Sequence, residues 1–411
     1  MTAVTLVLVE PGAHRPGGHR HRTLTALAAT HGDTLVVVPH GIAAETWTAL
    51  TAAGVEVTDP AGTMARVLAV AGTAAAAVAA AGQRAFASRC WPTAVRRLPH
   101  QVTLVARCLT EAACVRTGHR LADATATVVV LSASEALHGA AGLLGGPHTR
   151  FVHEVVTTED TMVRLAGRLT RRGERQVRVL APTEAVRDEL TTLFPHLPVA
   201  VRPFAVTDED DRLTDAERRQ ARVAFGVPAT EAAVCLVGGW WPYKDTGVVD
   251  AALGRLDVPL HLLVAGSPLD HEVLHRWSAL PQVRLRTMPG PASEAQIRAV
   301  YAASDATLVA RRPGVGKESG LVVDAVRLGV PLIVSDHDPD LTTTLAGQDW
   351  VRLFPPGDGV ALAGLLRDLT CSPLPRPTAA TAPALGVPTA AEQTAFLTEP
   401  KEPHPCPPCP R

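Results

Sequence analysis

The chain has 411 residues, of which 46% are hydrophobic and 19% are charged, too apolar a composition for a disordered chain. Its 39 basic and 40 acidic residues leave a net charge of -1. Neutralising the phosphates of a nucleic acid needs a cationic excess or stripe, so this balance argues against a nucleic-acid partner. At about one domain per 150 residues, the length predicts two or three globular domains.

Lysine is rare in this sequence. The chain contains Lys244, Lys317 and Lys401, and all its other basic residues are arginines. Against such a bias, a lysine marks a position where an ammonium group suits the site better than a guanidinium group.

The cysteines and the longest apolar run bear on the compartment. Seven cysteines, an odd number scattered over a long chain, argue against a disulfide framework and predict a cytoplasmic location. Cys406 and Cys409 form a C-x-x-C in a proline-rich segment with no second pair nearby, so we expect no metal or redox role there.

The first residues lack the basic region of a signal peptide. Residues 67–83 are uncharged but alanine-rich and shorter than the ~20 residues of a membrane span. We therefore expect a helix packed on the domain and no integral membrane segment.

The first half of the chain alternates short apolar strands with helices. Strands are predicted at residues 4–10, 34–38, 55–58, 125–131, 149–153, 176–181 and 198–202. Helices are predicted at residues 23–30, 43–53, 134–144, 158–172 and 183–193, with a further helical region over 60–123. This alternation implies right-handed crossovers and a parallel sheet. Residues 1–203 are therefore predicted to form one Rossmann-like, doubly wound domain.

A second series follows an acidic stretch. Residues 204–227 are predicted to be a solvated connector that contains a helix, without a metal role for its acidic run. Residues 228–370 then carry strands at 233–238, 260–265, 283–286, 306–309, 331–335 and 350–354, with helices near 246–255, 270–279, 293–303, 319–328 and 359–369. From residue 371 to 411 the chain is rich in proline and alanine, and we expect a disordered tail. The predicted fold class is α/β, with two Rossmann-like domains facing each other across a cleft.

Ligands bind open parallel sheets outside the carboxyl ends of the strands, so the loops that follow the strands are the candidate sites. The first such loop, residues 12–22, carries Gly17 and Gly18 where a helix begins. It does not spell G-x-G-x-x-G, and no acidic ribose partner follows about 20 residues later, which disfavours a nicotinamide dinucleotide. The loop is either a tight turn or a glycine pair that lets an anionic ligand reach the helix N-terminus.

Lys244 lies in the loop GGWWPYKDTG, between a predicted strand and a predicted helix. The free N–H groups and the positive dipole end of a helix N-terminus favour phosphate. We interpret Lys244 as a ligand of a diphosphate group; the alternative is an ordinary surface lysine.

The segment RRPGVGKESGLVVD, residues 311–324, occupies a similar position. It resembles a Walker A loop but lacks the first glycine, and Glu318 stands where a serine or threonine would bind magnesium. A phosphate-binding loop without a metal fits better, formed by Gly316, Lys317, Ser319 and Gly320. Because a carboxylate repels phosphate, Glu318 is predicted to bond a ribose or sugar hydroxyl.

His153 ends the predicted strand RFVH at the lip of the first domain. A histidine there can donate a hydrogen bond into the cleft. The chain has sixteen histidines, so a purely structural role is the alternative.

Together these segments resemble the GT-B glycosyltransferases, specifically the retaining type of family 4. In the C-terminal half the Lys244 loop is followed, in the expected order, by HLLVAGSP, IRAVYAASDATLVARR, ESGLVVDAVRLGVPLIVSD and VRLFPPGDGVALAGLL. The N-terminal half is similar more loosely, through the Gly17-Gly18 loop, VLSASEALHGAAG and VRVLAPTEAVRDEL. The resemblance covers about residues 1–370.

The resemblance implies a retaining glycosyltransferase that takes its sugar from a nucleoside diphosphate sugar held by the C-terminal domain. Lys244 would neutralise the diphosphate, and Gly18 would lie near the donor phosphates. Glu318 or Asp324 would bond the ribose and the sugar, and His153 would face the transferred sugar as a catalytic residue alongside Glu318. No metal and no cofactor beyond the donor are implied. The acceptor would be a small molecule, a saccharide or a lipid-linked molecule.

The sequence departs from the family pattern at two places. The family carries two glutamates eight positions apart, whereas here Val326 stands eight positions after Glu318, and Asp324 offers a second carboxylate. The family's arginine shortly before its lysine is also absent, and the nearby basic residues that could replace it are Arg311, Arg312 and Lys317. Other functions therefore stay open: a degenerate GT-B protein that binds a nucleotide or partner without catalysis, or another two-domain enzyme such as a sugar-nucleotide epimerase or a dehydrogenase.

Overall fold

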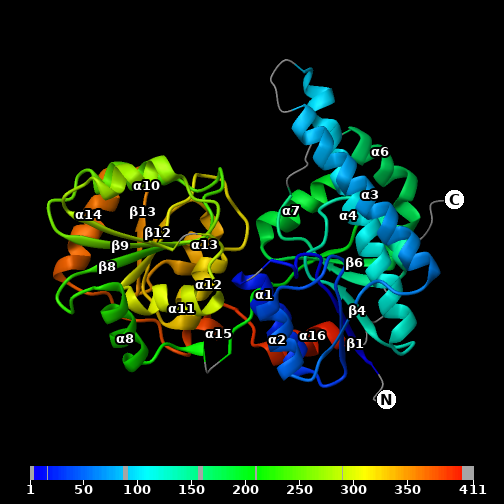
Figure 1. Ribbon diagram of the computed structural model, residues 1–411, viewed down its shortest axis with the longest axis horizontal. Helices are drawn as coiled ribbons and strands as arrows, with labels where there is room; N and C mark the ends of the chain where they lie inside the picture. The colour runs from blue at the N-terminus through cyan, green and yellow to red at the C-terminus, as the bar shows by residue number, and fades with distance from the viewer. Residues whose placement is uncertain are drawn as a thin grey trace.

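The computed structural model describes residues 4–15, 17–86, 91–155, 161–208, 211–288 and 290–399. These residues form two parallel sheets, each covered by helices, which lie side by side in Figure 1 with the N-terminal domain on the right. Within the described residues every strand expected from the sequence is present. The α/β fold class with two Rossmann-like domains is therefore confirmed.

The N-terminal sheet has the strand order β3-β2-β1-β4-β5-β6-β7, and all neighbouring strands pair in parallel. Its strands are β1 Leu6–Val9, β2 Thr34–Val37, β3 Glu56–Thr58, β4 Thr127–Val130, β5 His148–Phe151, β6 Val177–Ala181 and β7 Val199–Val201. Its helical elements are α1 Gly18–Thr30, α2 Ala44–Ala52, α3 Thr63–Ala85, α4 Thr93–Leu121, α5 His138–Gly145, α6 Thr161–Thr170, the 3-10 helix η1 Arg171–Gln176 and α7 Glu184–Leu193. The central strands are runs of valine and leucine because helices bury both of their faces.

The C-terminal sheet has the order β10-β9-β8-β11-β12-β13, again entirely parallel. Its strands are β8 Ala233–Val237, β9 Leu260–Ala265, β10 Val283–Met288, β11 Ala306–Val309, β12 Leu332–Ser335 and β13 Val351–Phe354. Its helices are α8 Asp215–Phe225, α9 Thr246–Leu253, α10 His271–Ser278, α11 Glu294–Ala303, α12 Gly320–Leu328, α13 Pro339–Leu345 and α14 Gly359–Cys371. In both sheets the strand order reverses beside the first strand, which places the ligand-binding crevices at β1/β4 and at β8/β11.

The acidic segment 204–227 is not a solvated connector along its whole length. Helix α8 begins with a capping box between Thr214 and Glu217 and packs on α11. Arg218 of this helix is buried and donates hydrogen bonds to the carbonyls of Leu328 and Gly329. The helix therefore belongs to the C-terminal domain. The high charge of its exposed face concealed the few residues that it buries.

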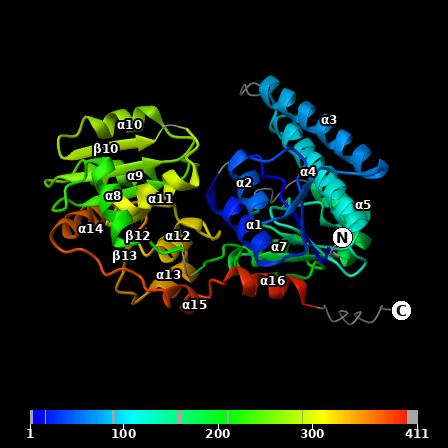
Figure 2. The ribbon, with the colours of Figure 1, turned by 60° about the horizontal axis from the view of Figure 1, so that its bottom comes forward.

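The sequence analysis also placed the start of the disordered tail too early, at residue 371. Helices α15 Thr381–Ala384 and α16 Ala390–Thr398 follow α14, and α16 packs on α1 of the N-terminal domain. Leu397 is 1% exposed in the core of that domain, and the guanidinium groups of Arg178 and Arg202 lie 4.5 and 4.6 Å from the ring centre of Phe396. Figure 2 shows the chain returning from the C-terminal domain to this place. Cys406 and Cys409 lie outside the described residues.

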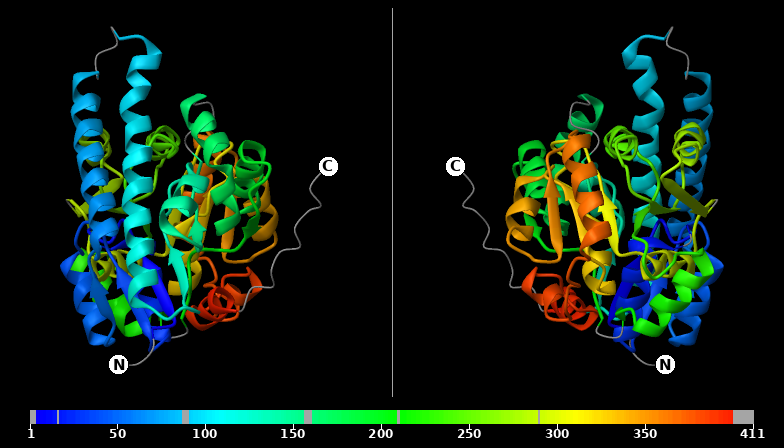
Figure 3. Two further views of the ribbon diagram at one scale, coloured as in Figure 1. Left: turned by 90° about the vertical axis from the view of Figure 1, so that its right-hand side faces the viewer. Right: turned by 90° about the vertical axis from the view of Figure 1, so that its left-hand side faces the viewer.

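Helices α3 and α4 form a long hairpin that extends beyond the sheet (Figure 3). They approach so closely that a Cβ atom on Gly72 would lie 2.4 Å from the hydroxyl of Thr110. Within the described part of the chain, α3 is the one helix long and apolar enough to cross a membrane by length and composition. It packs along α4, as predicted for residues 67–83, and exposes an apolar outer side at Met64, Val67, Val70 and Val78.

Candidate functional site

The turn after β8 folds the Lys244 side chain back over the end of its own strand. Gly238 has a φ of +84°, and a Cβ atom on Gly239 would lie 2.3 Å from the carbonyl oxygen of Ser267, so both positions require glycine. The Lys244 ammonium donates hydrogen bonds to the carbonyls of Val237 at 2.7 Å and Gly238 at 3.2 Å. The two glycines therefore allow the loops after β8 and β9 to meet. They also place the lysine at the switch point, the position between β8 and β11 where the strand order reverses.

The Lys244 ammonium makes no ion pair with any described carboxylate. Burial, together with the positive charges of Arg311 and Lys317, lowers the pKa of Lys244 to about 7. A backbone bridge joins Lys244 to Arg311, which follows β11. The half-buried ammonium therefore lies near other cations, which is unfavourable unless an anion binds there.

Arg311 strengthens this positive cluster. It is 4% exposed, and its guanidinium donates to the Lys317 carbonyl at 3.2 Å and to the Ser319 hydroxyl at 3.0 Å. Its Nε has no hydrogen-bond partner among the described residues. Burial lowers the pKa of Arg311, while the charges of Asp338 and Glu154 act in the opposite direction without forming an ion pair with it among the described residues. Sequence analysis treated Arg311 only as a candidate replacement for the missing family arginine.

Lys317 completes the cluster and faces the other domain. Its ammonium lies 2.5 Å from a carboxylate oxygen of Glu154 and 3.6 Å from the ring centre of Tyr243. Three cations from two loops thus share one paired carboxylate. Such a site can hold a diphosphate.

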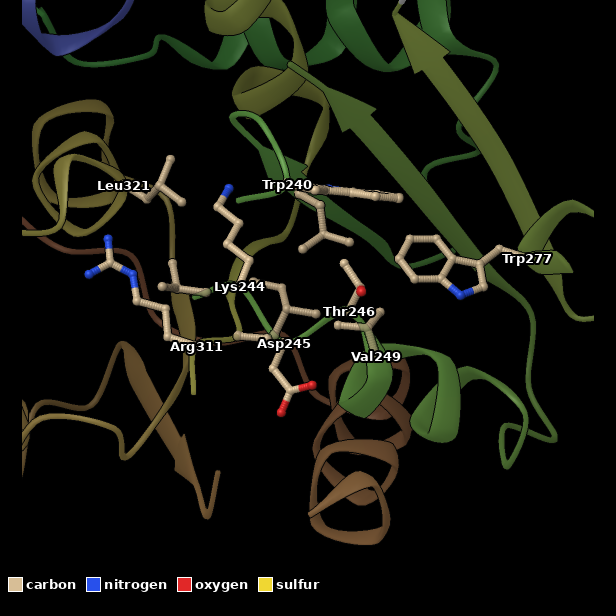
Figure 4. Close-up of a pocket in the computed structure, with 12 residues that line it drawn as sticks. Trp240, Lys244, Asp245, Thr246, Val249, Trp277, Arg311 and Leu321 are labelled. Atoms are coloured by element: carbon tan, nitrogen blue, oxygen red, sulfur yellow. The ribbon is translucent and has the colours of Figure 1, made fainter. Parts of the chain in front are cut away.

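A narrow pocket adjoins Lys244. Figure 4 shows Arg311 and the two tryptophans, Trp240 and Trp277, on opposite sides of the lysine. The pocket volume is about 10 Å³, enough for about one water molecule. A nucleotide would therefore lie across the mouth of this pocket.

The structure places Glu318 at the segment that links the domains. One carboxylate oxygen accepts hydrogen bonds from the backbone N–H groups of Phe204 at 3.0 Å and Ala205 at 3.3 Å. Burial raises the pKa of Glu318 to about 7 despite these bonds. Its predicted role toward a ribose or sugar hydroxyl stays a prediction. The contact with the linking segment was not visible in the sequence.

Asp324 is occupied by ion pairs. Its carboxylate accepts a hydrogen bond from Arg22 of α1 at 2.5 Å and lies 3.6 Å from Arg327. Arg22 also pairs with Glu294 at 2.8 Å. In this structure Asp324 joins the two domains, and its predicted contact with the donor stays a prediction that would require these bonds to open.

The predicted glycines divide into two groups. A Cβ atom on Gly17 would lie 2.9 Å from the carbonyl of Ala292, and one on Gly316 would lie 2.5 Å from Cβ of Ala185. Both glycines therefore allow the two domains to approach. Gly18, by contrast, has open space where a side chain would begin, so the start of α1 is accessible to a ligand. Donor binding by these residues stays a prediction.

The ring of His153 is held by a hydrogen bond within the N-terminal domain. Its Nε2–H donates to the Leu131 carbonyl at 2.9 Å, and burial lowers its pKa well below the usual value. The ring is therefore neutral, and its remaining nitrogen, Nδ1, is a hydrogen-bond acceptor. In this arrangement the ring has no N–H left to donate into the cleft, and the contact of His153 with a ligand stays a prediction.

His19 was missed by sequence analysis and lies beside His153. Their ring centres are 5.9 Å apart, and both rings contact Phe204. A Cβ atom on Gly320 would lie 3.2 Å from Nδ1 of His19, so the histidine packs against the start of α12. Burial, together with neighbouring arginines, lowers the pKa of His19 to about 3. The neutral rings therefore meet where the two domains touch.

Two Rossmann-like domains with their switch points facing a shared contact zone define the GT-B class of fold. No protein-family model matches the sequence, and no curated protein is similar enough in sequence to count as a relative. Solved structures do match over almost the whole chain. The Anabaena protein Alr3699/HepE in complex with UDP and glucose has a TM-score of 0.62 at 16% identity, with 96% of this chain and 98% of that chain covered.

Two further solved structures agree with this assignment. A glycosyltransferase from Rickettsia africae has a TM-score of 0.57 at 13% identity, covering 97% of this chain and 93% of its own. The N-terminal domain of Candida albicans trehalose-6-phosphate phosphatase has a TM-score of 0.61 at 9% identity, covering 96% and 95%. At these identities the likeness establishes the GT-B fold.

Proposed function

We propose that this protein is a glycosyltransferase that moves a sugar from a nucleoside diphosphate sugar to an acceptor hydroxyl. The observation that carries the proposal is the cation cluster of Lys244, Arg311 and Lys317 at the switch point of the C-terminal sheet, in which Arg311 is buried and the two lysines are half-buried. A diphosphate supplies the negative charge that this cluster lacks. The similarity in fold to a protein crystallised with UDP and glucose makes UDP the first donor nucleotide to test.

The cation cluster would act on the leaving group. As the bond between the anomeric carbon and the diphosphate oxygen breaks, negative charge grows on the diphosphate, and Lys244 and Arg311 would stabilise it. The N-termini of α9 and α12, which begin at Thr246 and Gly320 beside these residues, would add their dipoles. This arrangement needs no metal ion for charge neutralisation, and the proposal includes no cofactor beyond the donor.

The transferred sugar would lie between the two domains. His153 would accept a hydrogen bond from a sugar hydroxyl through Nδ1, and Glu318 would bond another hydroxyl after releasing the linking segment. We propose that transfer retains the anomeric configuration, on the basis of the sequence resemblance. The cytoplasmic location stays a prediction from the cysteine content.

Ligand-dependent thermal stability tests this proposal. UDP, GDP, dTDP, ADP and NAD are each added at millimolar concentration to the wild type and to Lys244→Met. A ligand at about 100 times its Kd adds about 2.7 kcal/mol to stability. A stabilisation by one nucleoside diphosphate that the variant loses supports the proposal and names the donor base. Stabilisation by NAD alone would overturn it in favour of a dinucleotide enzyme.

The chemistry requires a second measurement. With the nucleotide identified, its sugar conjugates are incubated with the protein and nucleotide release is followed. NMR of the anomeric proton in the product then reports retention or inversion. Tight nucleotide binding with no transfer or hydrolysis of any conjugate would favour a non-catalytic GT-B protein.

A further inference from the structure

A second cavity, of about 410 Å³, opens in the N-terminal domain between the loop after β1 and helix α4. Its basic wall consists of arginines and histidines from three regions of the chain, namely Arg15, Arg20, Arg107, His14, His40 and His100. Arg15 lies in the loop before α1, Arg20 lies in the first turn of α1, and Arg107 reaches in from α4. Basic groups that are distant in sequence therefore converge on one space.

The carboxylates of this wall already have cationic partners. Glu135 pairs with Arg107 at 3.3 Å, and Glu154 pairs with Lys317 at 2.5 Å. Among the described residues, Arg15 and Arg20 make no ion pair or hydrogen bond through their side chains. The positive charges of these two guanidinium groups are therefore not neutralised by Glu135 or Glu154, which pair with other cations.

Among the carboxylates, Glu10 has the strongest charge interaction with Arg20. Its two carboxylate oxygens already accept hydrogen bonds, from the backbone of Gly12 at 2.6 Å and from the hydroxyl of Ser132 at 2.8 Å. Glu10 is buried behind the wall and is not one of the residues that line the cavity. The guanidinium of Arg20 therefore stays available to a ligand.

The cavity adjoins the proposed donor site. His153 and Glu154 line it, and Glu154 bonds Lys317 of the cation cluster across the domain contact. A molecule in this cavity would lie on the acceptor side of the transferred sugar. Its volume falls within the ~300–1,000 Å³ of small-molecule sites, which fits a monosaccharide or a cyclitol.

We propose, on the basis of the proposed function, that the acceptor is a phosphorylated small polyol or monosaccharide whose phosphate binds Arg15, Arg20 and Arg107. Planar guanidinium groups match the paired oxygens of a phosphate, and several of them can share one phosphate group. A free hydroxyl oxygen of the same molecule forms the new bond to the anomeric carbon while the bond from that carbon to the diphosphate oxygen breaks. The diphosphate leaves with the bonding electron pair, the hydroxyl proton passes to a diphosphate oxygen, and the acceptor phosphate is unchanged.

Calorimetric binding of inorganic phosphate, without donor, tests the cavity independently of catalysis. The experiment uses the Lys244→Met protein, so that phosphate binding in the donor site is weakened. Arg20→Gln and Arg15→Gln are added to this background, with Arg172→Gln as a matched control, since Arg172 is exposed on η1 and does not line the cavity. Each cavity variant should weaken phosphate binding about 10-fold or more, since a charged hydrogen bond is lost. Arg172→Gln should leave binding unchanged.

Three results would overturn the proposal. Phosphate that binds no better than chloride at equal ionic strength, or equal Kd values for Arg20→Gln and Arg172→Gln, would remove the phosphate site. Acetate binding more tightly than phosphate would assign a carboxylate acceptor instead. Nucleotide binding by the wild type reports separately on the donor site, so failure of the acceptor inference is distinguishable from failure of the proposed function. Once transfer activity is established, glucose 6-phosphate and inositol phosphate can be compared directly, as acceptors, with glucose and inositol.

Discussion

Replacing Lys244 by methionine should have opposite effects on nucleotide binding and on folding. Methionine keeps the length and the apolar stem of lysine but removes the ammonium that faces Arg311 and Lys317. A charged hydrogen bond to a phosphate contributes about 1.5–3 kcal/mol, so Lys244→Met should raise the Kd of the donor diphosphate about 10- to 150-fold.

The pH dependence of binding separates this charge from other effects. Because the pKa of Lys244 is about 7 in the free protein, its protonated fraction falls about tenfold between pH 6 and pH 8. A bound diphosphate favours the charged form, so binding takes up a proton, and this contribution to affinity decreases with rising pH. The ratio of variant to wild-type Kd should therefore shrink about tenfold over this range. The nucleotide's own ionisation affects both proteins and cancels in the ratio.

The same pKa predicts the effect on folding without ligand. The unfolded chain binds this proton up to about pH 10.5, whereas the folded protein releases it near pH 7, so the lysine's contribution to stability rises with pH between these values. Lys244→Met should unfold at a higher temperature than the wild type at pH 6, by at least about 2 °C, and the difference should shrink toward pH 9.

Isothermal titration of the donor nucleotide at pH 6, 7 and 8, together with thermal unfolding at pH 6 and 9, measures both effects. Lys244→Arg is the matched control, because its guanidinium stays charged throughout and should show no loss of binding charge at pH 8. A pH-independent ratio of Kd values would refute the titration of Lys244. An unchanged Kd in Lys244→Met would remove the lysine from the site.

Other residues give predictions of different kinds. Glu318→Gln should impair transfer. Between about pH 4.5 and 7 the folded protein keeps the carboxyl proton of Glu318 while the unfolded chain has released it, so the wild type loses stability as the pH rises through this range and the variant should not. Thermal unfolding at pH 5 and 8 tests this, and an unchanged pH dependence in the variant would contradict it. Arg22→Met should destabilise the protein by about 3 kcal/mol and increase its radius of gyration in X-ray scattering, because Asp324 loses a short ion pair across the domain contact; an unaltered scattering curve would count against this role. Leu397→Ala should cost about 2–4 kcal/mol in urea unfolding, whereas Leu169→Ala, at a site 77% exposed, should cost less than about 0.5 kcal/mol; equal losses would argue against the packing of α16.

The parallel sheets could be predicted because each central strand, such as Leu6–Val9, is a continuous apolar run between turn residues. Lys244 was predictable for a similar local reason, since its strand, glycine pair and helix lie within a few residues of one another. The partners of the other site residues were not. Asp324 pairs with Arg22, which is 302 positions away, and no local pattern connects the two.

The orientation of His153 and the docking of α16 show the same limit. The carbonyl that fixes the histidine ring belongs to Leu131, on the neighbouring strand connection, and only the folded sheet brings the two together. In α16 the apolar residues are mostly alanines with one phenylalanine and one leucine, too weak a period to identify a helix by sequence alone. Its stability comes from α1 and from Arg178 and Arg202, which lie far away in the sequence.

The return of α16 to the N-terminal domain affects how chimeric proteins of this fold should be made. A single crossover near residue 208, between the domains, would exchange α16 together with the C-terminal domain and would leave the new N-terminal domain with a foreign helix against α1. The natural unit of exchange is therefore discontinuous, consisting of residues 4–208 together with 390–398. A chimera that keeps both pieces from one parent could combine the N-terminal domain of one protein with the C-terminal domain of another without leaving a cavity in the core between α16 and α1.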